Sequence, residues 1–209
     1  QIYVFNISGY PIGAATTGWT SDAVSWQSMG ALIFLAGWGL WMARAHIKAV
    51  FRKAFHSDSE VDDSQELLSY RAAVFGFIGS LMFVSAWLYH AGLSLWVVFV
   101  FLPLALLLFL GLSRAVAELG LVYVYYRIQP HHAVIQAFGA NLIGTPGVVI
   151  LGFMNVFNHT YITGKGYLMP PFTQAVKAVD KAVSPRRITA VLWLALALGF
   201  AISVVNTLH

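Results

Sequence analysis

Cysteine is absent from the sequence, and charged residues are scarce. Without thiols the chain forms no disulfide framework, thiolate metal site or iron–sulfur cluster, and it holds no thiol nucleophile. Lys, Arg, Asp and Glu together make up 10% of the residues, whereas an ordinary soluble domain carries about 25%. A water-exposed surface is not built from so few charges, so the composition excludes a typical soluble protein.

Apolar residues dominate instead. They form 59% of the 209 residues, and the mean hydropathy is +0.74. One membrane crossing takes about 20 apolar residues, which gives a chain of this length room for roughly four to six crossings. We therefore expect an all-α, polytopic transmembrane helix bundle, with residues 1–209 as a single membrane domain in the cytoplasmic membrane.

Four apolar runs are long enough to be membrane spans. They cover residues 23–43, 72–89, 93–112 and 188–208. The short sequence His90-Ala91-Gly92 separates the second run from the third. We expect this turn to join the two spans into a tight helical hairpin.

Charged residues gather directly after the first span. The basic members are Arg44, His46, Lys48, Arg52 and Lys53. Five of the eight acids follow between residues 58 and 66. Basic loops stay on the cytoplasmic side of a membrane, so we place residues 44–71 in the cytoplasm. The same rule accounts for the net charge of +4, and we expect no nucleic-acid partner.

Glycines and a proline interrupt the apolar segment at residues 133–157. The basic residues between 165 and 187 belong to the cytoplasmic side by the same rule, as does the chain before the segment. We expect the segment to enter and leave the membrane on one side, as a broken or re-entrant hairpin. A plain fourth span, with residues 165–187 outside, is the alternative. Residues 171–182 alternate apolar and charged positions at helical spacing and predict an interfacial helix.

Two charged residues follow the third span. Arg114 and Glu118 are four residues apart, so one face of a helix presents both and they can pair. Ionisable groups at membrane depth are costly and mark either a pathway or a structural clamp. An interfacial salt bridge is one interpretation, and a substrate or ion pathway is the other.

The stretch at residues 141–147 supplies polar groups within the interrupted segment. Asn141 contributes an amide and Thr145 a hydroxyl, and the glycines and proline free backbone groups. Irregular backbone is tolerated at membrane depth only beside protein or a water-filled cavity, and broken helices build transporter sites in this way. We expect residues 114–118 and 141–147 to line one polar site, with Tyr123 as a further partner. A proline-kinked helix packed through small residues is the alternative.

Histidines are weak ligand candidates. His131 and His132 are adjacent, so on a helix their side chains point about 100° apart, and no carboxylate stands at a metal-ligand spacing. The acidic residues 58–66 lack the glycine and the spacing of a calcium loop. We expect no bound metal and no cofactor, and a pigment- or haem-associated subunit using His90, His131 or His159 is the weakest reading. Walker, Gly-x-Ser-x-Gly and His-Glu-x-x-His motifs are absent, so we expect no enzyme activity.

Five sequence elements together resemble a known family. They are residues 43–47 (ARAHI), 51–55 (FRKAF), 62–66 (DDSQE), 68–71 (LSYR) and 113–120 (SRAVAELG). The family that they resemble comprises uncharacterised prokaryotic multi-pass membrane proteins with a domain of unknown function. In it, similar elements occur in the C-terminal half of a longer chain, before a Met-Pro element like Met169-Pro170. The resemblance covers most of residues 30–190 and implies, more distantly, a likeness to oligopeptide transporters.

We interpret the chain as a transporter-like integral membrane protein, or part of one, for a small solute or a peptide. Its pathway residues would be Arg114, Glu118, Asn141 and Thr145. A non-catalytic structural subunit of a larger membrane complex is the alternative. The expected partners are the lipid bilayer, other membrane chains or a missing N-terminal half, and a second copy of the chain. From the abrupt ends of the sequence we expect a fragment of a longer protein.

Overall fold

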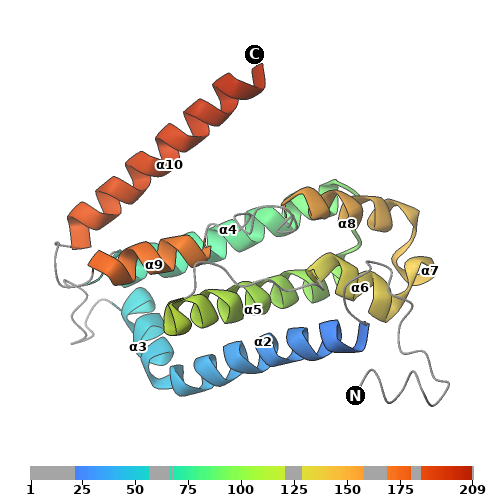
Figure 1. Ribbon diagram of the computed structural model, residues 1–209, viewed down its shortest axis with the longest axis horizontal. Coiled ribbons are helices and arrows are strands. Elements are labelled where there is room, and N and C mark those ends of the chain that lie inside the picture. The colour runs from blue at the N-terminus through green and yellow to red at the C-terminus, as the bar shows by residue number, and fades with distance from the viewer. Residues whose placement is uncertain are drawn as a thin grey trace. The chain divides into compact units, whose positions relative to one another are not determined.

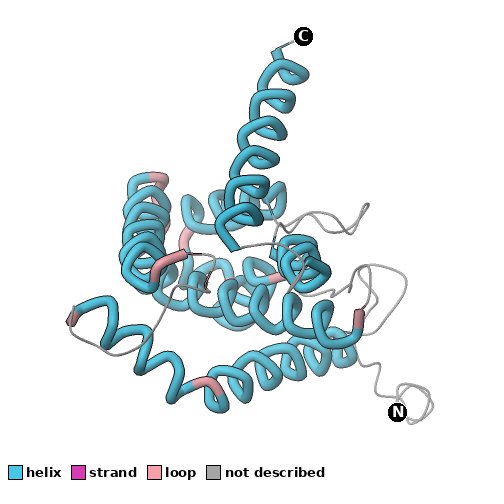
Figure 2. Tube along the Cα trace, turned by 90° about the vertical axis from the view of Figure 1, so that its left-hand side faces the viewer, coloured by secondary structure: helices cyan, strands magenta, loops and turns pink. Residues whose placement is uncertain are grey.

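The computed structural model describes residues 22–56, 66, 68–120, 129–157, 169–179 and 185–208. Within these ranges the chain forms nine α-helices and no strand (Figure 2). The prediction of an all-α fold is therefore confirmed. Tyr123, His159 and the acidic residues between 58 and 63 lie outside the described ranges, so the expectations placed on them stay predictions.

Among the described residues, three helices are long and apolar enough to cross a membrane. They are α4 (Tyr70–His90), α5 (Leu95–Leu119) and the stretch Ile188–Asn206 of α10 (Pro185–Leu208). A fourth crossing results if α2 (Asp22–Met42) and α3 (Arg44–Phe55), which are broken at Ala43, count as one bent span. These helices are those of a membrane helix bundle.

Helix α5 is longer than the apolar run that predicts it. The sequence places the end of the span near residue 112, whereas the helix continues to Leu119. No glycine or proline occurs between Leu112 and Gly120, and Gly120 ends the helix in the left-handed conformation at φ 65°. Arg114 and Glu118 therefore belong to the last turns of α5.

Contacts group the chain into two compact units. The first comprises residues up to Met42 together with Phe83–Thr173, and the second comprises Ala43–Met82 and Gln174–His209. The first unit thus contains α2, the end of α4, α5 and the helices between residues 130 and 157. The second contains α3, the start of α4, most of α9 (Met169–Val179) and α10. Helix α9 lies where the interfacial helix is expected.

Helices α2 and α5 pack closely in the first unit. Gly111 of α5 lies against the α2 backbone, and a Cβ atom built there would collide with the carbonyl oxygen of Leu32. A small residue at such a contact lets two helix backbones approach. Farther along both helices, Gly39 of α2 contacts the Arg114 guanidinium, so the two helices run in the same direction (Figure 1). Buried side chains line this contact: Met29, Leu32, Leu108, Leu112 and Ala115.

A glycine-capped turn joins α4 to α5. The Gly92 N–H donates to the Tyr89 carbonyl at 3.0 Å, and the Leu93 N–H donates to the Leu88 carbonyl at 3.0 Å. Gly92 has φ 111°, and Leu88 and Leu93 are buried in the same cluster. This is the Schellman arrangement, in which a left-handed glycine and an apolar contact close a helix end. The tight turn expected at residues 90–92 is therefore observed, but α4 and α5 are not among the described helices that pack closely on each other, so the tight helical hairpin itself is not confirmed.

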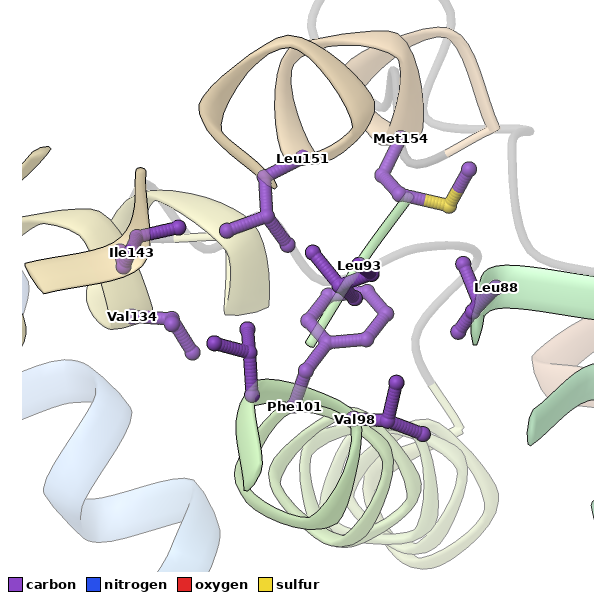
Figure 3. Close-up of a cluster of buried hydrophobic side chains, with 9 residues drawn as sticks. Leu88, Leu93, Val98, Phe101, Val134, Ile143, Leu151 and Met154 are labelled. Atoms are coloured by element: carbon purple, nitrogen blue, oxygen red, sulfur yellow. The ribbon is translucent and has the colours of Figure 1, made fainter. Parts of the chain in front are cut away.

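Three short helices pack on the first half of α5. They are α6 (Pro130–Phe138), α7 (Ala140–Ile143) and α8 (Thr145–Phe157). Val134, Ile143, Leu151 and Met154 from these helices gather with Leu88, Leu93, Val97, Val98 and Phe101 in one buried cluster. Figure 3 shows Leu151 and Met154 pointing from α8 toward Leu93 and Phe101. This cluster fixes the interrupted segment beside the turn between α4 and α5.

Candidate functional site

The interrupted segment breaks at two glycines. Gly139 separates α6 from α7 with φ 77° and ψ 151°, and Gly144 separates α7 from α8 with φ 79° and ψ 156°. This backbone region is accessible essentially to glycine alone. The Gly139 N–H still donates to the Ile135 carbonyl, and the Gly144 N–H to the Ala140 carbonyl. Each glycine thus ends one helix and lets the chain change direction before the next.

The three short helices contact one another in all pairs, and the chain turns back at α7 (Figure 1). α8 is 13 residues long, about 20 Å at the helical rise, which is less than the hydrocarbon thickness of a bilayer. It is apolar but too short to cross alone. The segment is therefore a broken hairpin of helices, as the glycines and proline predict, and not one continuous helix.

The α7–α8 break lies beside the turn between α4 and α5. A Cβ atom built on Gly92 would lie 3.6 Å from Cβ of Pro146, and one built on Gly147 would lie 3.5 Å from Cδ1 of Leu93. Thr145 directly precedes Pro146, so it lies near the turn that comes before α5, at the N-terminal end of that helix. Asn141 is in α7, one short helix earlier, and both side chains are exposed. A ligand, water or lipid can reach the two polar groups at this end.

Arg114 and Glu118 form an ion pair at the other end of α5. The Arg114 Nε donates to Glu118 Oε1 at 2.6 Å, and the two side chains are 33% and 52% exposed. The guanidinium also lies over Gly39, three residues before α2 ends at Met42. The pair therefore sits where two parallel helices both end, and the expected pairing on one helical face is observed.

The four predicted site residues do not gather in one place. Arg114 is 20 residues into α5 if Leu95 is counted first, which corresponds to about 30 Å of helix. Thr145 lies beside the turn before Leu95, as the contact between Gly92 and Pro146 places it. One polar site lined by residues 114–118 and 141–147 together is therefore not formed. The polar pairs mark opposite ends of α5.

Buried polar side chains occur that were not among the predicted pathway residues. Ser113 of α5, Gln129 and His131 are 4%, 5% and 1% exposed. The Ser113 Oγ, Gln129 Oε1 and both ring nitrogens of His131 have no hydrogen-bond partner among the described residues. Buried polar atoms without partners are uncommon in proteins and point to a bound water, a ligand or a partner group. The sequence offered one signal for two of these side chains. Gln129 and His131 flank Pro130, and proline favours the first position of a helix, so both residues belong to the start of α6.

The two adjacent histidines differ in their surroundings. The rings of His131 and His132 have centroids 4.2 Å apart, yet His131 is buried and His132 is exposed. In the described ranges no three metal-ligating side chains come together. The described part of the chain thus offers these histidines no third ligand.

A comparison with protein families assigns the chain to one family. Residues 1–209 match DUF6785, a family of unknown function, so the chain belongs to that family. The comparisons with curated proteins and with solved structures each found no match. The expected membership in a family of unknown function is confirmed, and the name of the family indicates no substrate.

Proposed function

We propose that this member of the family is a transporter-like membrane protein, or part of one, whose solute path runs beside the broken hairpin α6–α8. The solute is a small polar molecule or a short peptide. The chain lies in the cytoplasmic membrane as a multi-pass protein. No catalytic step, metal or cofactor belongs to the proposal.

One observation supports this proposal above all others: an apolar segment that is packed on a spanning helix breaks twice at glycines in a glycine-only conformation. Each break removes helical hydrogen bonds, and lipid offers no replacement for them. Broken helices at membrane depth persist where protein or a watery cavity satisfies the backbone, and transporters place their binding sites at such breaks. A continuous helix would serve a purely structural role at lower cost.

The polar side chains have distinct roles in this proposal. Asn141 and Thr145, exposed beside the breaks, are the solute-binding groups. Arg114 and Glu118 lie at the opposite end of α5 and form the second mouth of the path. The buried His131, together with Gln129, supplies polar atoms between the helices that a passing water or solute can bind.

An uptake measurement tests the proposal. The full chain is reconstituted into liposomes and offered a mixture of isotope-labelled amino acids, dipeptides and tripeptides, and the retained solutes are identified by mass spectrometry. We expect retention above that of protein-free liposomes, and we expect Asn141→Leu to lower it while Phe153→Leu on the same helical hairpin does not. Retention equal to that of empty liposomes across the mixture would count against transport.

A structural subunit is the second candidate, and one observation favours it. In the apolar stretch of α10 that could span a membrane, 6% of the residues are buried, whereas 39% are buried in the corresponding stretch of α5. Exposed apolar side chains run along α10, including Leu194, Phe200 and Ile202. A helix that contributes so little to its own chain's core is suited to pack on lipid or on other membrane chains. Co-purification of a fixed second membrane protein without any uptake would favour this candidate.

A further inference from the structure

The helix α3 is the most positively charged of the described helices. Its twelve residues include Arg44, Lys48, Arg52 and Lys53 and no acid. Lys48 and Arg52 are exposed. A helix with this charge is too polar to cross a membrane by itself, because each Lys or Arg at the centre of a membrane helix makes its insertion markedly less favourable.

The cations of α3 share one side of the helix. Successive residues are about 100° apart around the axis, so Arg44, Lys48 and Arg52 fall within about 80° of one another. Phe51 borders this stripe and Phe55 falls within it, between Arg44 and Lys48, and the two side chains are 43% and 57% exposed. A row of cations flanked by exposed aromatic rings is the pattern of a helix that lies at the boundary between lipid headgroups and acyl chains.

Three contacts hold α3 on the first turns of α4. The Arg71 Nε donates to the carbonyl of Ala54 at 3.2 Å, which satisfies a backbone oxygen in the last turn of α3. The His46 and Tyr70 rings lie 5.9 Å apart, and the Phe55 and Phe75 rings 5.7 Å apart. Ala54 is consequently 1% exposed.

These contacts fix the depth of α3. Tyr70 and Arg71 are the first residues of a helix long and apolar enough to span a membrane, so α3 is held at one end of that span. α3 also follows α2 directly after Ala43. The end of a span is the level of the lipid headgroups.

We infer that α3 is an interfacial helix that binds the phosphate groups of anionic phospholipids through Lys48 and Arg52. The cations of α3 complement the negative phosphate groups. The position of α3 at the end of the α4 span and its exposed phenylalanines both suit the boundary between headgroups and acyl chains. Residues 57–65, which carry four of the acids, are the competing occupant for these cations. The exposed Phe51 favours lipid, because an acidic peptide segment has little apolar surface to cover it. This inference does not depend on transport.

Lipid selectivity measured by electron paramagnetic resonance tests the inference. The full chain is placed in phosphatidylcholine nanodiscs with a spin-labelled phosphatidylglycerol or phosphatidylcholine tracer, and the two association constants are compared. We expect a preference for phosphatidylglycerol that Lys48→Gln/Arg52→Gln reduces by up to about fivefold per cation, since a cation near the surface contributes about 1 kcal/mol. The charge-conserving control, Lys48→Arg/Arg52→Lys, should keep the preference.

Salt provides a test on the unmodified protein, should the double variant fail to fold. Raising the salt from about 0.1 M to about 1 M shortens the screening length from about 10 Å to about 3 Å, so the preference should fall. Equal association of both tracers with the wild type overturns the inference, and so does a preference that persists unchanged in Lys48→Gln/Arg52→Gln or at high salt. If the wild type shows no preference and Asp62→Asn/Asp63→Asn creates one, the acidic residues 57–65 bind the cations of α3 in place of lipid, and the inference is wrong.

Discussion

The ion pair of Arg114 and Glu118 shows how much position matters for a single charged residue. At the centre of a membrane helix each charge would cost about 2.5–3.5 kcal/mol, which an i, i+4 pair worth about 0.2–0.5 kcal/mol does not offset. The pair lies instead at the end of α5, level with the end of α2, and both side chains are partly exposed. At that level the cost is small, because long charged side chains reach the headgroup region. The pair is therefore stable there without further partners.

The two members of this pair should respond differently to substitution. Glu118→Gln should change the melting temperature little, since an exposed pair contributes about 0–1 kcal/mol, and under the proposed function it should abolish uptake. Arg114→Ala should destabilise by about 1 kcal/mol or more, because it also removes the guanidinium that packs over Gly39. Melting in detergent and uptake into liposomes measure the two effects. A Glu118→Gln protein that unfolds, beside a fully stable Arg114→Ala protein, would reverse these roles.

At the scale of elements, two kinds of glycine shape the first unit. Gly111 is required for space, since its absent side chain lets α5 approach the α2 backbone. Gly139 and Gly144 are required for conformation, since their positive φ angles end one helix and begin the next. Substitutions by alanine separate these causes, because alanine adds one methyl group and restricts φ.

Gly111→Ala should destabilise the protein by about 1–3 kcal/mol, the usual cost of overpacking. The added methyl group would meet the Leu32 carbonyl, which is backbone and cannot rotate away. Gly37→Ala on α2 is the matched control, since a Cβ there meets no atom within 4 Å. This control should be neutral or stabilising by up to about 1 kcal/mol, as alanine favours helix. Equal melting temperatures for the two variants would contradict the close packing of α2 on α5.

Gly144→Ala should destabilise by about 1–3 kcal/mol for a different reason. A Cβ at Gly144 has room, with Cδ of Pro146 at 4.0 Å, but its φ of 79° strains any residue other than glycine. Gly152→Ala within α8 provides the comparison, because that glycine has open space and no positive φ. If thermal melting shows Gly144→Ala to be as stable as Gly152→Ala, the segment is a continuous helix at this point.

Local patterns predicted the elements but not their arrangement. The hairpin turn followed from Gly92 between two apolar runs, and the breaks in α6–α8 from glycines within an apolar run, since both are properties of a few adjacent residues. The opposite placement of Arg114 and Thr145 was not predictable, because it depends on Pro146 meeting Gly92 across 54 positions of sequence. The burial of His131 has the same long-range origin. Helix α6 also starts earlier than expected, because Pro130 suits the first position of a helix.

For the whole molecule, the charge distribution predicts the orientation in the membrane. Residues 44–71 and 165–187 should share the cytoplasmic side, and the α4–α5 turn should face the other side. The chain has no cysteine, so single cysteines can be introduced cleanly. Ser64→Cys, which lies outside the described ranges, and Thr173→Cys should be labelled from one side of sealed vesicles, and Ala91→Cys from the opposite side. Labelling of Ser64→Cys and Thr173→Cys from opposite sides would exclude a re-entrant segment.

Water access at the broken hairpin tests the central claim most directly. In liposomes containing the full chain, a hydrophilic maleimide should modify Asn141→Cys and Thr145→Cys, because the proposed solute path is filled with water there. Phe153→Cys, at a position 61% exposed on α8, should stay unmodified because its side chain faces lipid. All three should react once detergent removes the bilayer, which verifies that each thiol is intact. If Asn141→Cys and Thr145→Cys are as protected in the bilayer as Phe153→Cys, the helices are sealed against water and the chain is not a transporter.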